Sequence, residues 1–143
     1  MSRKVAREMA FKAIFAINFQ SEEVNPEEII SAEIHDSETK LDISKEDMSY
    51  IKEVCHGVFE KVSELDNEIE NSLKGWKMER ISKTDLAILR LAIYEILYRT
   101  DIPAKVSINE AIELAKAFSE PSSASFVNGV LGRIMNKAEE TNE

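Results

Sequence analysis

The segment from Pro103 to Arg133, PAKVSINEAIELAKAFSEPSSASFVNGVLGR, restricts the possible folds more than any other part of the chain. Ser107 and Glu110 form an S-x-x-E pattern, in which a hydroxyl and a carboxylate cap the first turn of a helix reciprocally. Apolar residues at helical spacing follow: Ile108, Ala111, Ile112 and Ala115. The proline-containing polar loop 119–125 ends this run, and a second helix is predicted to begin near Phe126.

The rest of the chain also shows the apolar spacing of amphipathic helices. Helices are predicted at about 2–19, 25–34, 44–63, 64–73 and 82–98, with N-caps at Ser2, Asn25, Ser44 and either Ser82 or Thr84. No segment has the alternating pattern and turn residues of a β-hairpin. The sequence therefore predicts an all-α protein, a compact bundle of about seven helices in two small lobes. The lobes are expected at about 1–80 and 81–138 of a single domain, 1–143.

The composition indicates one domain without disulfides. Of the 143 residues, 43% are hydrophobic and 31% charged, which is ordinary for a soluble protein. Cys55 is the only cysteine, and no apolar leader opens the sequence. The apolar run 86–98 is shorter than the about 20 residues that a membrane-spanning helix needs. We therefore expect a cytoplasmic protein with a buried central helix and no membrane association.

Charge is distributed unevenly along the chain. The formal net charge is −9, which by itself argues against nucleic acid because phosphates repel an acidic protein. The amino end is nevertheless basic, with Arg3, Lys4 and Arg7, whereas acidic residues dominate 22–47 and 139–143. A basic end can bind RNA locally, while the acidic remainder suits a basic protein partner.

Four motifs together resemble the NusB family of bacterial transcription antitermination factors. They are SRKVAR at 2–7, LAILRLAIYEILYR at 86–99, KVSINEAIELAKAF at 105–118 and FVNGVL at 126–131. The resemblance covers nearly the whole chain and is weakest at 21–44. It implies a partner, the small-subunit ribosomal protein NusE, and a ligand, the single-stranded boxA element of nascent ribosomal RNA. It also implies membership of the RNA polymerase antitermination complex.

The basic amino end is the first candidate RNA-binding site. Arg3, Lys4 and Arg7 can neutralise phosphates, and guanidinium groups can also stack on bases. Cations at a helix start oppose the positive end of the helix dipole, which favours a functional reason for them. A solvated helix start explains the same residues. The resemblance favours RNA contact, because the arginine-rich amino end of the family binds RNA.

The second candidate site is the start of the last helix. Phe126 follows a serine-rich loop, where a ring can stack on an unpaired base. Core packing in the row Phe126, Val130 and Ile134 explains the pattern equally well. The resemblance implies RNA contact by Phe126, next to Ser122, which stands where the family often has an acidic residue. Arg133 is a further candidate phosphate contact, or a surface cation near a helix end.

A candidate partner-binding face follows from the resemblance. It comprises two aromatic residues of the first helix and two acidic residues near the start of the central helix: Phe15, Phe19, Glu79 and Asp85. An aromatic patch edged with carboxylates suits a basic partner such as NusE. Core packing is the alternative for the aromatic residues, and helix capping is the alternative for Asp85.

The sequence contains no recognisable catalytic or cofactor motif. Cys55 and His56 are adjacent, so on a helix they point about 100° apart and cannot pair as nucleophile and base. His35 has no second ligand at metal-binding spacing, and phosphate-binding glycine loops are absent. We therefore expect no enzymatic activity, no cofactor and no metal. The alternative function is a helical protein–protein interaction module, or a homodimer, without RNA activity.

Overall fold

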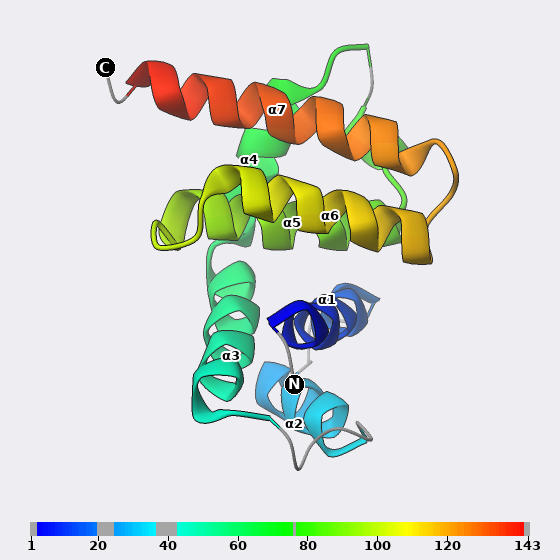
Figure 1. Cartoon of the computed structure of the whole chain (residues 1–143). Coiled ribbons are helices and arrows are strands. Elements are labelled where there is room, and N and C mark those ends of the chain that lie inside the picture. Colours follow the sequence, from blue (N-terminus) through cyan, green and yellow to red (C-terminus); the bar gives the residue numbers. More distant parts are fainter. Residues whose placement is uncertain (1–2, 20–24, 37–42, 76, 142–143) are drawn as a thin grey trace.

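The computed structural model describes residues 3–19, 25–36, 43–75 and 77–141, and helices are the only regular structure in these ranges (Figure 1). The helices are α1 (Arg3–Phe19), α2 (Pro26–Asp36), α3 (Lys45–Glu60), α4 (Val62–Ser72), the 3-10 helix η2 (Met78–Arg80), α5 (Lys83–Tyr98), α6 (Ala104–Phe118) and α7 (Ser123–Thr141). The prediction of an all-α fold with seven α-helices is confirmed.

Three predicted N-caps are present. The side chains of Asn25, Ser44 and Ser82 each accept a hydrogen bond from a backbone N–H two or three residues further on, at 3.0, 3.0 and 3.1 Å. These bonds satisfy donors that have no partner inside a helix, which is why the three helices begin where they do. Ser2, the predicted cap of the first helix, lies outside the described residues.

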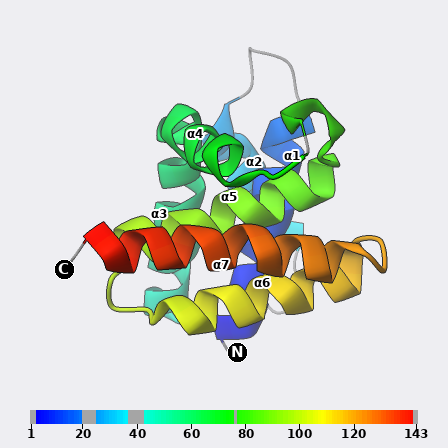
Figure 2. The same ribbon diagram turned by 90° about the horizontal axis from the view of Figure 1, so that it is seen from above.

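Helix α5 forms the centre of the molecule because its sequence is apolar on nearly every side. Its buried apolar residues are Ala87, Ile88, Leu89, Leu91, Ala92, Ile93 and Tyr94. The helix contacts α1, α3, α4, α6 and α7. Figure 2 shows α6 and α7 running side by side along it. The prediction of a buried central helix at 86–98 is confirmed.

The remaining helices form two groups around α5 (Figure 1). Helices α1, α2 and α3 pack together on one side, while α6 and α7 pack together on the other. Helix α4 contacts α5 and α7 as well as α3. The division into lobes near residue 80 stays a prediction, and the packing adds that α4 joins the two groups.

The start of α6 differs from the prediction. The helix begins at Ala104, and its N-cap is Pro103, whose carbonyl accepts from the N–H of Val106 at 2.9 Å. Ser107 therefore lies inside the helix instead of capping it. Its hydroxyl donates to the buried carboxylate of Glu95 at 2.8 Å. This distant partner explains the serine, and the S-x-x-E pattern does not reveal it.

The start of α7 also differs from the prediction. The helix begins at Ser123, three residues before Phe126, after a turn in which the N–H of Ser123 donates to the carbonyl of Glu120 at 2.9 Å. Pro121 stands in this turn, where its fixed φ angle favours the tight bend. Phe126 consequently lies on the second turn of α7.

Candidate nucleic-acid interface

Arg3 begins α1 and lies over a buried tyrosine. Its Nε donates to Oδ1 of Asp47 on α3 at 2.9 Å, and its guanidinium carbon lies 4.5 Å from the centre of the Tyr50 ring. The Arg3 side chain is 35% exposed. The guanidinium can therefore reach a phosphate while Asp47 and the cation–π contact keep it oriented.

Lys4 is the exposed cation of the same helix turn. It borders a groove of about 210 Å³ between α1 and α6, whose lining also includes Glu110, Glu113 and Leu114. An exposed ammonium group at a helix start is suited to phosphate contact. Arg3 and Lys4 thus form the surface part of the predicted basic site.

Arg7 differs from the prediction of a surface cation. Only 5% of it is exposed, and its guanidinium donates to both oxygens of Glu95, from Nε at 2.9 Å and from a terminal nitrogen at 3.1 Å. Tyr50 and Ser107 donate to the same carboxylate. We call these four side chains, from α1, α3, α5 and α6, the Glu95 junction. Arg7 therefore holds α1 against α5, and its guanidinium is directed to Glu95 instead of to solvent.

Two groups of the Glu95 junction, Arg7 and Tyr50, have pKa values raised above their usual values. Burial acts to lower the pKa of Arg7, but hydrogen bonding to Glu95 and nearby negative charge outweigh burial and leave this pKa above its usual value. Burial and the charge of Glu95 raise the pKa of the Tyr50 hydroxyl. Arg7 therefore remains a cation and Tyr50 a neutral donor, which is what a buried carboxylate needs.

Sequence reasoning missed the Glu95 junction, although two signals were present. Arg7 shares a helix face with Phe11 and Ile14, four and seven residues further on, and both of these are buried. Glu95 is the acidic residue inside the apolar run 86–98. A cation on one apolar face and an anion in another apolar helix are complementary, because buried charges require partners.

The second candidate site lies at the α6–α7 corner, residues 119–123. Ser122 is exposed, and its carbonyl accepts from the N–H of Phe126 at 3.3 Å. Phe126 is half-buried and packs in part against the core. The core-packing interpretation of Phe126 is therefore met in part, and its contact with RNA stays a prediction. The exposed part of this aromatic side chain is suited to contact with an unpaired base.

Arg133 lies on α7 and joins that helix to the end of α4. Its Nε donates to the backbone carbonyl of Ser72, the last residue of α4, at 2.6 Å. A cation at a helix carboxyl end is favourable because it faces the negative end of the helix dipole. This contact gives Arg133 a structural role, and its contact with phosphate stays a prediction.

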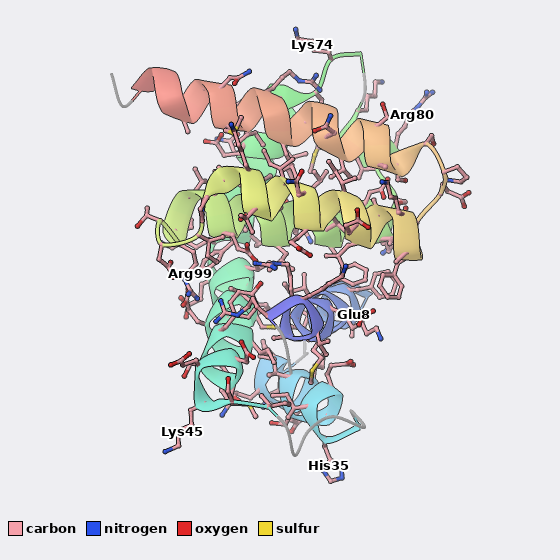
Figure 3. All side chains as sticks on the ribbon, viewed as in Figure 1. Glu8, His35, Lys45, Lys74, Arg80 and Arg99 are labelled. Atoms are coloured by element: carbon pink, nitrogen blue, oxygen red, sulfur yellow. The ribbon has the colours of Figure 1, made fainter. Side chains whose placement is uncertain are left out.

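Two members of the predicted partner face are accessible. Phe15 is half-buried, with its ring centre 6.4 Å from that of Phe11. Glu79 is exposed on η2. Figure 3 places Arg80, the next residue, on the side of the molecule where α6 meets α7. The side chain of Phe19, which ends α1, lies outside the described residues.

Asp85 differs from the prediction of a carboxylate on the partner face. It is 7% exposed, and its two oxygens accept from the hydroxyls of Ser119 at 2.6 Å and Ser123 at 2.8 Å. Its backbone N–H donates to the capping side chain of Ser82. The carboxylate is thus directed into the protein, toward the α6–α7 corner.

Three features of the described ranges bear on other kinds of function. No helix there is long and apolar enough to cross a membrane. Those same ranges contain no group of three or more His, Cys, Asp or Glu residues that could hold a metal ion. Cys55 is buried, and burial followed by the charge of Glu33 raises its thiol pKa to about 12.

Comparison with known proteins decides the family. The sequence profile of the NusB family matches residues 4–136. The transcription antitermination protein NusB of Acetivibrio thermocellus is 47% identical over 135 residues, covering 94% of this chain and 89% of that protein. The chain belongs to the NusB family. The profile begins at Lys4, so the match includes every candidate residue of both sites and of the partner face except Arg3.

Solved NusB structures share the fold described above. NusB of T. maritima is 35% identical, with a TM-score of 0.84 over 95% of this chain and 92% of that one. A chain in a crystal structure of the antitermination factors NusB and NusE with dsRNA has a TM-score of 0.81 and is 24% identical. That match covers 94% of this chain and 96% of the other.

Proposed function

We propose that this protein is a transcription antitermination factor that binds single-stranded boxA RNA together with NusE. In this role it helps RNA polymerase to continue through ribosomal RNA operons. The observation that carries the proposal is membership of the NusB family, in which a close relative is named as an antitermination protein. A NusB of the same fold has been crystallised with NusE and dsRNA, which supports NusE and RNA as the classes of partner.

The RNA surface is assigned to two places on the fold. Arg3 and Lys4 supply positive charge at the start of α1, while Ser122 and Phe126 supply a hydroxyl and an aromatic face at the α6–α7 corner. Helix α6 connects them, because Lys4 borders its middle and the corner follows its end. Arg133 is a secondary candidate. Arg7 supports this surface indirectly, by holding α1 in place.

We assign the partner face to Phe15 and Phe19 of α1 and to Glu79 of η2. Aromatic residues and carboxylates together suit a basic ribosomal protein, because complementary charge guides the encounter and aromatic rings supply contact area. Asp85 is buried, so we leave it out of this face.

The first experiment measures the salt dependence of RNA binding. In the double variant Arg3→Ala and Lys4→Ala, binding of boxA RNA should weaken at low salt. The slope of log K against log salt should become shallower by up to about 1.4, because each lost phosphate contact on single-stranded RNA contributes about 0.7. The helical signal in circular dichroism should be unchanged, since neither side chain is buried.

The matched control is the double variant Lys74→Ala and Lys77→Ala. It removes the same charge from exposed residues, and Figure 3 shows Lys74 on the side of the molecule away from α1. An equal loss in both double variants would mean that only net charge matters. If the unaltered protein retains no RNA at any salt concentration, the alternative of a protein–protein module or homodimer replaces this proposal.

We also propose that the protein acts in the cytoplasm and catalyses no reaction. The support for this assignment is the family and the state of the two residues with catalytic potential. The raised pKa of Cys55 makes its thiol a poor nucleophile, and Nε2 of His56 lies 2.8 Å from a carboxylate oxygen of Glu27.

A further inference from the structure

Asp85 connects the first turn of the central helix to both ends of the α6–α7 corner. Ser119 is the C-cap of α6, and Ser123 is the first residue of α7. Each serine hydroxyl donates to a different oxygen of the Asp85 carboxylate, at 2.6 and 2.8 Å, and the two hydroxyl oxygens lie 2.9 Å apart. One buried anion therefore fixes where α6 stops and where α7 starts.

This arrangement fixes the position of Phe126. The ring lies one turn beyond Ser123, and the N–H of Phe126 donates to the carbonyl of Ser122 inside the corner. Because the first turns of a helix move together, a shift at Ser123 displaces the ring by a similar amount. Phe126 is partly buried against the core, so Asp85 and the core together set the direction of its side chain.

A carboxylate suits this position better than a neutral side chain. Its two oxygens accept from two hydroxyls at once, and its charge faces the amino ends of α5 and α7, where the helix dipoles are positive. An asparagine has one acceptor oxygen, so one serine would have to turn its hydroxyl and accept from the amide instead. Asp85→Asn thus keeps the shape of the side chain but weakens one connection.

We propose that Asp85 is a positioning residue for RNA binding, which holds the α6–α7 corner so that Phe126 presents its ring to an unpaired base. Asp85 itself touches no RNA. This inference rests on the proposed function, because it requires the corner to be part of the RNA surface. It also gives the carboxylate a role different from the partner contact expected from the sequence.

The test is a double-mutant cycle with fluorescently labelled single-stranded boxA RNA. Phe126→Ala should weaken binding by about 5- to 160-fold, the range for loss of one stacked base. Asp85→Asn should weaken binding by at least about 3-fold when Phe126 is present, and should add nothing when residue 126 is alanine. Equal effects of Asp85→Asn in both backgrounds would overturn the proposal, because Asp85 would then act elsewhere.

The matched control is Asp66→Asn. This carboxylate is partly buried and, like that of Asp85, accepts two hydrogen bonds, here from Arg90 at 2.8 and 2.7 Å, but it belongs to α4. Its substitution should leave RNA affinity within about 2-fold in either background, as expected for a site with no shared partners. If Asp66→Asn weakens binding as much as Asp85→Asn, general loosening of the fold explains both and the proposal fails.

A second measurement does not depend on RNA. Fluorophenylalanine is placed at position 126 of the full chain, and its ¹⁹F resonance is compared in the Asp85, Asp85→Asn and Ser123→Ala proteins. A shifted or broadened resonance in both variants supports positioning, and Ser123→Ala provides the result if Asp85→Asn does not fold. An unchanged resonance in the folded variants overturns the inference. If the resonance changes in the variants but the unaltered protein binds no RNA, the proposed function is wrong. The structural role of Asp85 at the corner then still stands.

Discussion

Arg7 and Lys4 lie three residues apart and carry the same charge, yet their environments are opposite. Lys4 is exposed to solvent, whereas Arg7 is buried against Glu95 with two hydrogen bonds. The cost of removing each side chain therefore depends on what it leaves behind. Removal of the Lys4 side chain leaves solvent in its place. Removal of the Arg7 side chain leaves the buried carboxylate of Glu95 without its countercharge.

We predict that Arg7→Ala lowers the free energy of unfolding by about 3–5 kcal/mol, the usual cost of leaving a buried charge unpaired. Lys4→Ala should change it by no more than about 0.5 kcal/mol, as is usual for surface positions. Urea denaturation followed by circular dichroism measures both. Similar values for the two variants would show that Glu95 finds another partner or is protonated.

A second prediction at this scale concerns Glu79. Reversal of its charge in Glu79→Lys should weaken NusE binding, mainly through slower association, because a basic partner loses electrostatic guidance. Surface plasmon resonance at low and high salt measures the association rate. The melting temperature should stay the same, since Glu79 is exposed. Glu70→Lys, a charge reversal at another exposed residue, on α4, serves as the control, and the same loss of NusE binding there would remove Glu79 from the interface.

At the scale of helices, two glycines that both lie inside helices have opposite roles. A Cβ atom on Gly57 of α3 would lie 2.2 Å from Cε2 of Tyr94 on α5, whereas one on Gly132 of α7 would meet nothing within 4 Å. Tyr94 is 8% exposed, and its hydroxyl donates to Glu53, so its ring has little room to move. Gly57 therefore allows α3 and α5 to cross closely.

We predict that Gly57→Ala destabilises the protein by about 1–3 kcal/mol, the usual cost of overpacking a core. Gly132→Ala should stabilise it by up to about 1 kcal/mol, because alanine favours the helical conformation more than glycine does. Thermal unfolding of the two variants beside the unaltered protein measures the difference. If Gly57→Ala were neutral, the crossing of α3 and α5 would have to be looser than described.

The helix starts show which features could be predicted from the sequence alone. Asn25, Ser44 and Ser82 were predictable as caps, because each bonds to a backbone group within three residues. Ser107 fits the same pattern, but its partner Glu95 lies on another helix and cannot be found from local spacing. The candidate sites follow the same rule. Exposure of Lys4 agrees with its charge, whereas burial of Arg7 and of Asp85 depends on distant contacts.

For the whole molecule, alkaline pH is the condition that should weaken the fold. Burial, then the hydrogen bond and charge of Glu53, raise the pKa of Tyr94 from 10.0 to about 12. Between pH 10 and about pH 12 the Tyr94 hydroxyl has lost its proton in the unfolded chain and retains it in the folded chain. The native state thus binds more protons, so the free energy of unfolding falls as pH rises. The stabilising contribution of Tyr94 is fully present below pH 10 and is lost as the pH rises through about 12.

We predict that stability decreases between about pH 10 and 12 and that Tyr94→Phe makes this decrease shallower. Urea unfolding at a series of pH values and constant ionic strength gives the slope for each protein. Loss of the hydrogen bond to Glu53 lowers the baseline of the variant, so the slope is the quantity compared. Parallel curves would exclude Tyr94 as a cause, and Cys55, whose pKa is raised to about 12, would be tested next.

The Glu95 junction also has a consequence for biosynthesis. Arg7 and Glu95 are separated by 88 positions, so at about 5–20 residues per second roughly 4–18 s pass between their additions to the growing chain. During this interval the guanidinium of Arg7 has no buried countercharge. The amino-terminal helices therefore cannot complete their packing while α5 is still inside the ribosome. The basic segment around Arg7 is translated before α5 but reaches its final position only after α5 has been made.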